Sequence, residues 1–96
     1  MSDAQPLPNA VVDDALLSLK DWKREEGGLR KRFRRASFPD AIAFVGRVAE
    51  LAEADQHHPD IDIRYRNVIL FLTTHEAGGV TEMDLALARQ IEDVAG

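Results

Sequence analysis

One nearly continuous apolar run, VILFLTT at residues 68–74, requires a strand that is covered on both faces or lies at a subunit interface. We expect this strand to span residues 68–73. A second strand is expected just before it, at residues 61–65, with Arg66-Asn67 as the connection. The chain must therefore fold around a sheet that other elements cover.

The segment DWKREEGGLRKRF, residues 21–33, is typical of a β-hairpin. It predicts a short strand near Trp22, a turn at Gly27-Gly28 and a second strand after the turn. In that second strand every other residue is an arginine, so one face packs at least in part while the other faces water. The residues predicted for the packed face are Leu29, Lys31 and Phe33.

Two helices are predicted in the first half of the chain. Residues 9–20 carry apolar side chains at helical spacing, with Asn9 as a candidate N-cap. A second helix is expected to begin after Ser37, with Pro39 in its first turn, and to end near Ala54. Its predicted buried stripe consists of Phe38, Ile42, Val45, Val48, Ala49 and Ala52.

A third helix is predicted near the C-terminus, where Thr81 is the expected N-cap and Asp84 completes a capping box. The element order is then α-β-β-α-β-β-α. It predicts an α+β fold, a single two-layer domain with a four-stranded antiparallel sheet and three helices on one face. We assign this domain to residues 9–96 and expect residues 1–8 to be a flexible N-terminus.

Composition excludes several classes of protein. The chain has 96 residues and no cysteine, which excludes disulfides and cysteine zinc sites. No apolar run approaches the roughly 20 residues that a membrane-spanning helix needs. The net charge is −5, although GGLRKRFRRAS carries five bases and no acid. We expect a cytoplasmic protein that does not bind membranes, and we interpret the basic stretch as the solvated face of a strand.

The segment EADQHHPDIDIRY, residues 53–65, holds the chain's most suggestive side chains. His57 and His58 are adjacent where the second helix should end, and Pro59 stops that helix. His75 follows the long apolar strand and should reach the same edge of the sheet. The unperturbed pKa of histidine, roughly 6.5, suits proton transfer near neutral pH. Taken singly, each histidine could equally be part of an ordinary turn.

Two carboxylates accompany these histidines. Glu53 lies in the last turn of the second helix, at the negative end of the helix dipole, so we expect a nearby histidine to compensate its charge. Asp84 lies at the start of the third helix, where its capping role explains it without any catalysis.

Taken together, the spacing of these residues resembles the signature of the pterin-4a-carbinolamine dehydratases. The pattern is Glu-x3-His-His-Pro, then Tyr, His and Asp at fixed gaps, and the segment TTHEAGGVTEMDLALA agrees with it. The resemblance covers about residues 7–95. The matching positions are Glu53, His57, His58, Pro59, Tyr65, His75 and Asp84.

The resemblance implies an enzyme that dehydrates 4a-hydroxytetrahydrobiopterin to quinonoid dihydropterin, in tetrahydrobiopterin recycling, with no metal and no organic cofactor. It implies His57, His58 and His75 as catalytic residues, with His57 and His75 as the acid/base pair. Glu53, Pro59 and Asp84 are implied to bind the pterin or orient the imidazoles. These residues are all present.

Two positions depart from the family pattern. Ile61 replaces a common aromatic residue, and Gln56 replaces an acid found in some members. Neither change removes a proton-transfer group, but both can alter the grip on the pterin. The resemblance also implies a homodimer or homotetramer, as does the small core of so short a chain.

Three alternatives stay open. Proteins with this fold also serve as non-catalytic assembly or dimerisation factors, for example for Rubisco or a transcription factor. A metal site could be built from His57, His75 and a carboxylate. Nucleic-acid binding is the weakest alternative, because the protein is acidic overall and no aromatic residues interleave with its basic stretch. That stretch contains Arg30, Arg32, Arg34 and Arg35.

Overall fold

Four strands form one antiparallel sheet in the computed structural model, which describes residues 5–96. The strands are β1 (Lys23–Glu25), β2 (Gly28–Arg34), β3 (Asp60–Arg64) and β4 (Asn67–Leu72), in the spatial order β1-β2-β4-β3. The helices are α1 (Asn9–Leu16), α2 (Phe38–Asp55) and α3 (Glu82–Ala95). The predicted order α-β-β-α-β-β-α and the α+β class are confirmed.

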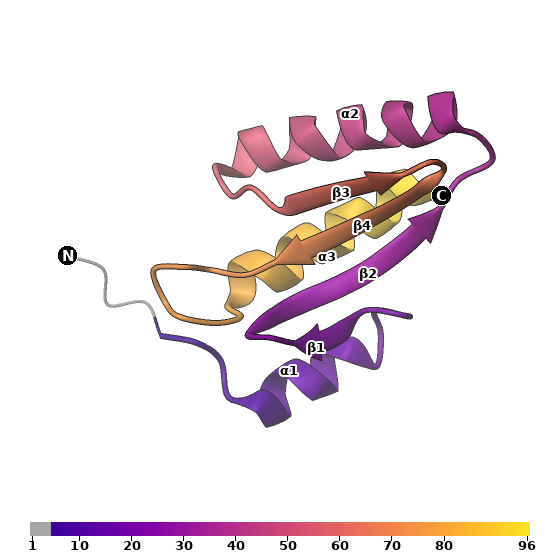
Figure 1. The fold of residues 1–96 in the computed structure, drawn as a ribbon. Helices are drawn as coiled ribbons and strands as arrows, with labels where there is room; N and C mark the ends of the chain where they lie inside the picture. The colour runs from indigo at the N-terminus through magenta and orange to yellow at the C-terminus, as the bar shows by residue number, and fades with distance from the viewer. Residues whose placement is uncertain (1–4) are drawn as a thin grey trace.

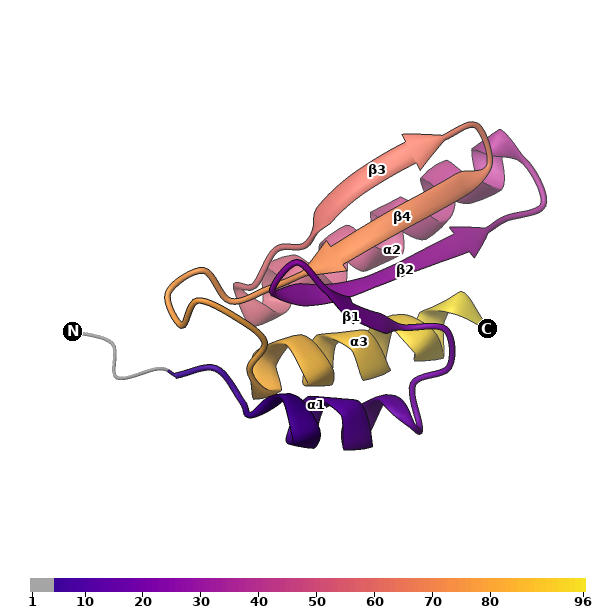
Figure 2. The same cartoon turned by 60° about the horizontal axis from the view of Figure 1, so that its bottom comes forward.

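The helices cover one face of the sheet and leave the other open. Figure 1 shows α3 behind the strands and α1 next to β1 at the lower edge, and Figure 2 shows α2 behind β2 and β4; α2 and α3 contact each other. Within residues 5–96 no helix combines the length and the apolar character needed to cross a bilayer.

The burial pattern of the central strand β4 reflects the different surroundings of the two faces of the sheet. Its residues alternate between buried and half-buried, because one side meets the helices and the other meets the open face. Leu72 pairs with Leu29 and Val68 with Phe33, so the predicted packed face of β2 is confirmed. On the open face the guanidinium of Arg30 lies 5.0 Å from the centre of the Phe71 ring. Within one chain, the open side of β4 is therefore only half covered.

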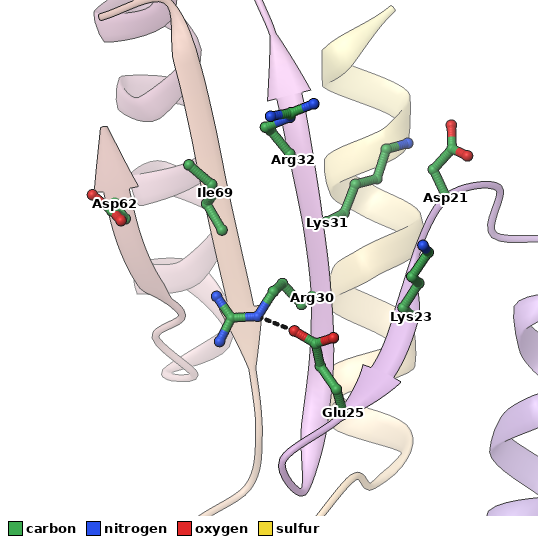
Figure 3. A pocket seen from close by; sticks show the side chains of 8 residues that line it. All are labelled: Asp21, Lys23, Glu25, Arg30, Lys31, Arg32, Asp62 and Ile69. Atoms are coloured by element: carbon green, nitrogen blue, oxygen red, sulfur yellow. Dashed lines mark ion pairs between the residues drawn. The ribbon is translucent and has the colours of Figure 1, made fainter. Parts of the chain in front are cut away.

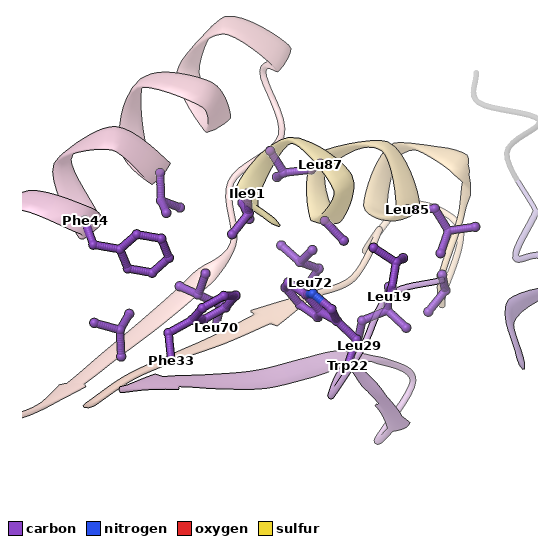
Figure 4. Close-up of a cluster of buried hydrophobic side chains, with 14 of the residues drawn as sticks. Leu19, Trp22, Leu29, Phe33, Phe44, Leu70, Leu72, Leu85, Leu87 and Ile91 are labelled. Atoms are coloured by element: carbon purple, nitrogen blue, oxygen red, sulfur yellow. The ribbon is translucent and has the colours of Figure 1, made fainter. Parts of the chain in front are cut away.

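The core lies between this sheet and the helices (Figure 4). Phe33 is its aromatic centre, with Trp22 edge-on at 5.9 Å and Phe44 at 4.9 Å between ring centres. Its larger buried side chains are Val12, Leu19, Trp22, Leu29, Phe33, Phe44, Val48, Val68, Leu70, Leu72, Leu85, Leu87 and Ile91.

The buried face of α2 corrects the sequence prediction. Ser37 is the N-cap, as predicted, and its hydroxyl accepts the Asp40 N–H at 3.2 Å. Phe38 and Ile42, however, are 47% and 44% exposed. The helix is rotated so that a neighbouring stripe enters the core, which is possible because apolar residues occupy more than one stripe of α2. The buried residues are Ala41, Phe44, Val48 and Ala52.

Three local boundaries also differ from the predictions. α1 begins after Pro8, which takes the N-cap position predicted for Asn9, and it ends at Leu16 instead of continuing to residue 20. The first hairpin turns at Glu26 and Gly27, whose φ angles are 52° and 77°, one residue earlier than predicted. Positive φ at both positions is the requirement of a two-residue hairpin turn.

The predicted flexible N-terminus lies partly outside the described residues. Within the described part, the Leu7 N–H donates to the Val80 carbonyl at 2.8 Å, and the Leu7 side chain packs against the core. The segment just before α1 therefore contacts the loop that leads into α3.

Candidate functional site

The three histidines line one cavity at the edge of the sheet where α2 and β4 both end. The cavity measures ≈ 260 Å³. Its lining residues are Gln56, His57, His58, Thr73, Thr74, His75, Glu76 and Met83. The expectation that His75 reaches the edge occupied by His57 and His58 is therefore met.

The end of α2 directs the two adjacent histidines to different places. Gln56 adopts a left-handed conformation with φ 52° and ψ 39°, and the His57 N–H donates back to the Ala52 carbonyl at 3.0 Å. This is a Schellman-type helix end, which reverses the chain direction. As a result the His57 side chain is only 10% exposed, whereas the His58 side chain is 60% exposed.

His57 is anchored by a buried carboxylate. Its Nε2 lies 2.5 Å from Oδ1 of Asp84, whose side chain is 0% exposed. The other carboxylate oxygen, Oδ2, accepts the Thr81 N–H at 2.9 Å and the Thr74 hydroxyl at 2.8 Å. An ionised carboxylate can only accept hydrogen bonds, so we assign the proton between the two side chains to Nε2 of His57.

This arrangement defines the free end of the imidazole. With Nε2–H bound to the carboxylate, a neutral His57 carries its lone pair on Nδ1. That atom has no hydrogen-bond partner among the described residues, and it is not sealed from solvent. His57 is therefore oriented at one nitrogen and open at the other, which is the arrangement that a general base or acid requires.

His58 pairs with the acid at the end of α2. Its Nε2 lies 3.0 Å from Oε1 of Glu53, in a pair whose side chains are 60% and 70% exposed. The expectation that a histidine compensates this acid is confirmed. An ion pair this exposed contributes little to stability, in the range of 0–1 kcal/mol.

His75 stands in a tight loop beyond β4. The loop is closed by a bridge between Thr74 and Gly79, and the Thr74 N–H donates to the Gly79 carbonyl at 3.0 Å. Gly78 has a φ of 76°, a conformation that favours glycine. His75 is exposed and makes no side-chain hydrogen bond to the described residues, so its imidazole is available to a ligand.

None of the three implied binding residues lines the cavity. Glu53 approaches it only through His58, and Pro59 follows the histidines without contributing to the lining. Asp84 lies behind His57 instead of in the cavity wall. The sequence analysis missed Thr73, Thr74, Glu76 and Met83, although the segment TTHEAGGVTEMD places all four close to His75 or Asp84.

A larger cavity of ≈ 600 Å³ lies on the open face of the sheet (Figure 3). Its side chains are mostly charged, and Arg30 is paired with Glu25 at 2.5 Å. No histidine lines this cavity, and the side chains of the Arg30–Glu25 pair are 38% and 44% exposed. The smaller histidine cavity is the better candidate for chemistry, because only it combines a buried hydrogen-bonded carboxylate with proton-transfer groups.

The sequence left open a metal site built from His57, His75 and a carboxylate. Among residues 5–96, no group of three or more His, Asp or Glu side chains is arranged to hold a metal ion. The Asp84 carboxylate is already engaged by three donors.

Comparisons with known proteins agree on one family. The family model described as pterin 4 alpha carbinolamine dehydratase matches residues 5–94. A protein from Roseiflexus sp. (strain RS-1) is 53% identical over 91 residues, covering 95% of this chain and 98% of that protein. One from Chloroflexus aurantiacus (strain ATCC 29366) is 53% identical over 90 residues, covering 94% of this chain and 97% of that protein. The names of both give the assignment to pterin-4-alpha-carbinolamine dehydratase as provisional.

Two solved structures share the fold. A transcriptional coactivator/pterin dehydratase from Brucella melitensis superposes with a TM-score of 0.91 and 31% identity, covering 96% of this chain and 100% of that chain. A pterin dehydratase-like protein, identified as a RuBisCO assembly factor in the alpha-carboxysome, has a TM-score of 0.69 and 26% identity. That match covers 79% of this chain and 90% of the other.

Proposed function

The chain belongs to the pterin 4 alpha carbinolamine dehydratase family, and we propose that it dehydrates 4a-hydroxytetrahydrobiopterin to quinonoid dihydropterin and water. The observation that carries the proposal is the buried Asp84–His57 pair, which opens onto a cavity shared with His58 and His75. We further propose that the reaction serves tetrahydrobiopterin recycling in the cytoplasm, the pathway and location expected in the sequence analysis.

The reaction needs one proton delivered and one removed. The C4a–O bond breaks as the leaving hydroxyl takes up a proton and departs as water, and the N5 proton is lost as the new C4a–N5 double bond forms. Two imidazoles on one cavity can carry out both transfers, and each well-placed acid or base contributes roughly 10²–10⁴-fold in rate.

We assign His57 and His75 as this acid/base pair. The assignment of His57 is supported by its hydrogen bond to Asp84, which leaves Nδ1 free. The assignment of His75 is supported by its exposed imidazole, which has no competing partner among the described residues. His58, held by Glu53, is assigned to orient the hydroxyl group.

The activity can be tested directly. A 4a-carbinolamine is supplied, and quinonoid dihydropterin is followed by its absorbance with the wild type, His57→Ala and His75→Ala. Glu50→Gln is the matched control, because Glu50 is an exposed residue of α2 outside the cavity. We expect the control to match the wild type and both histidine variants to be severely slowed. A wild type no faster than its histidine variants would refute the proposal.

A second function is favoured by the similarity to the RuBisCO assembly factor. A non-catalytic assembly or dimerisation role would use the outer surface and would not need the histidines. A pull-down from the native host distinguishes the two functions. A stoichiometric protein partner that still binds His57→Ala and His75→Ala would support the assembly role.

We also propose a homodimer or homotetramer. β3 is an edge strand, and in an antiparallel pair with a second copy Asp60 would lie opposite Arg64, Ile61 opposite Ile63 and Asp62 opposite the second Asp62, beside the Arg64 that pairs with it. Figure 1 shows α2 running along β3, and α2 exposes Phe38 and Ile42. A second copy could cover these apolar residues and extend the sheet. Sedimentation of a monomer at micromolar concentration would contradict this.

A further inference from the structure

A chain of hydroxyl groups lies behind the Asp84–His57 pair. The Met83 N–H donates to Thr81 Oγ1 at 3.2 Å, and Thr81 Oγ1 lies 2.8 Å from Thr74 Oγ1. Thr74 Oγ1 in turn donates to Asp84 Oδ2 at 2.8 Å. The capping of α3 is thereby connected to the anchored histidine.

The direction of every bond in this chain follows from the chemistry of its ends. A carboxylate can only accept, so the Thr74 proton must point at Asp84 Oδ2. Thr74 Oγ1 must then accept from Thr81, whose own oxygen accepts the Met83 N–H. Each hydroxyl donates once and accepts once, and no alternative arrangement satisfies the groups.

Burial increases the effect of losing the Thr74 hydroxyl on the Asp84 carboxylate. Thr74 is 6% exposed and Asp84 is 0% exposed, so water does not readily replace a lost donor. Without the Thr74 hydroxyl, Oδ2 keeps only the Thr81 N–H, and the carboxylate is held against rotation by that contact and by His57 alone. Rotation would move Oδ1 away from His57 Nε2.

We propose that Thr74 is a positioning residue, whose hydroxyl holds the Asp84 carboxylate so that His57 carries its proton on Nε2 and presents Nδ1 to the cavity. Thr74 acts on the reaction only through Asp84 and His57. Its role in catalysis rests on the proposed function, whereas its effect on the imidazole does not.

The test compares Thr74→Val, which has nearly the same shape without the hydroxyl, with Thr74→Ser, which restores it. The first readout is the ¹⁵N chemical shifts of the His57 ring, recorded without substrate at a pH where the imidazole is neutral. We expect the wild type and Thr74→Ser to show the Nε2–H tautomer and Thr74→Val to show a mixture. Either an Nδ1–H tautomer in the wild type or an unchanged tautomer in Thr74→Val would overturn the proposal.

The second readout is dehydratase kinetics. Loss of an outer partner of a metal-bound histidine costs roughly 10- to 100-fold in activity, and we take the same range for the carboxylate-anchored His57. We expect this loss in kcat for Thr74→Val, with little change in KM and with recovery in Thr74→Ser. A kcat for Thr74→Val within twofold of the wild type would overturn the proposal. If the wild type is inactive, the function fails, and the tautomer readout still decides the role of Thr74.

A destabilised control separates positioning from folding. Ser37→Ala removes the N-cap hydroxyl of α2 at the opposite end of that helix and touches no residue of the cavity. It should lower stability without changing the His57 tautomer or kcat. If Thr74→Val does not fold, the wild-type tautomer and the slowly exchanging hydroxyl proton expected for buried Thr74 provide the test. A rapidly exchanging Thr74 hydroxyl would count against the proposal.

Discussion

Replacing Asp84 by asparagine changes one buried atom and should reverse the direction of the hydrogen bond between this side chain and His57. The asparagine oxygen can still accept the Thr74 hydroxyl and the Thr81 N–H, as Oδ2 does in the wild type. The amide nitrogen then faces His57 Nε2 in place of Oδ1, and it can only donate. His57 must accept that hydrogen bond, so its proton moves to Nδ1 and the lone pair turns away from the cavity.

The expected loss of activity follows from this tautomer. An imidazole with a proton on Nδ1 cannot accept a second proton at that atom, and the same substitution behind the histidine of a serine protease lowers kcat about 10⁴-fold. We expect a loss between about 10² and 10⁴ for Asp84→Asn, because His75 still contributes its own proton transfer. Stability should fall by roughly 1–3 kcal/mol, since the three hydrogen bonds that the charged carboxylate accepts are exchanged for bonds with a neutral amide.

The assay measures kcat with a 4a-carbinolamine and the free energy of unfolding in urea. Asp55→Asn is the matched control, because Asp55 is exposed and its carboxylate accepts only the Gln90 side-chain amide, at 2.8 Å. The control should retain full activity. An Asp84→Asn protein that is folded and within threefold of the wild type would refute the assigned role of the carboxylate.

Three further predictions concern the fold. Phe44 is fully buried against Phe33, so Phe44→Ala should lower the free energy of unfolding by about 3–5 kcal/mol in urea titrations, and a cost below 1 kcal/mol would contradict the described core. A Cβ added at Gly28 would lie within 2.7 Å of ring atoms of Phe71 and of a backbone oxygen, so Gly28→Ala should lower the melting temperature, whereas the wild-type value would argue against this close approach. The Arg24 guanidinium donates to Asp13 and lowers the pKa of that carboxyl below its usual 3.8. The pair should therefore stabilise the fold at pH values above 3.8, and its contribution should be lost as the pH falls through the lowered pKa. Unfolding of Arg24→Gln measured across this range should differ slightly from wild type at neutral pH and match it in strong acid.

Local signals in the sequence were sufficient for much of the fold. Ser37 caps α2 and Thr81 caps α3, as predicted, because a cap depends on hydrogen bonds between residues two or three positions apart. The alternation in β2 was also sufficient to predict its buried face, because successive residues of a strand point to opposite faces of the sheet. The histidines could be named as candidates from their spacing and the family resemblance.

Other features depend on contacts between distant parts of the chain. α2 has apolar residues on more than one stripe, and packing against Phe33 selects Phe44 for the core and leaves Ile42 exposed. His57 and Asp84 are 27 positions apart, and Thr74 and Asp84 are 10 apart, so no local pattern shows that they bond. Asp84 could be recognised from sequence as a helix cap. Only the packing of α3 against α2 makes the same carboxylate the anchor of an imidazole, because it brings Asp84 to the histidine that follows α2.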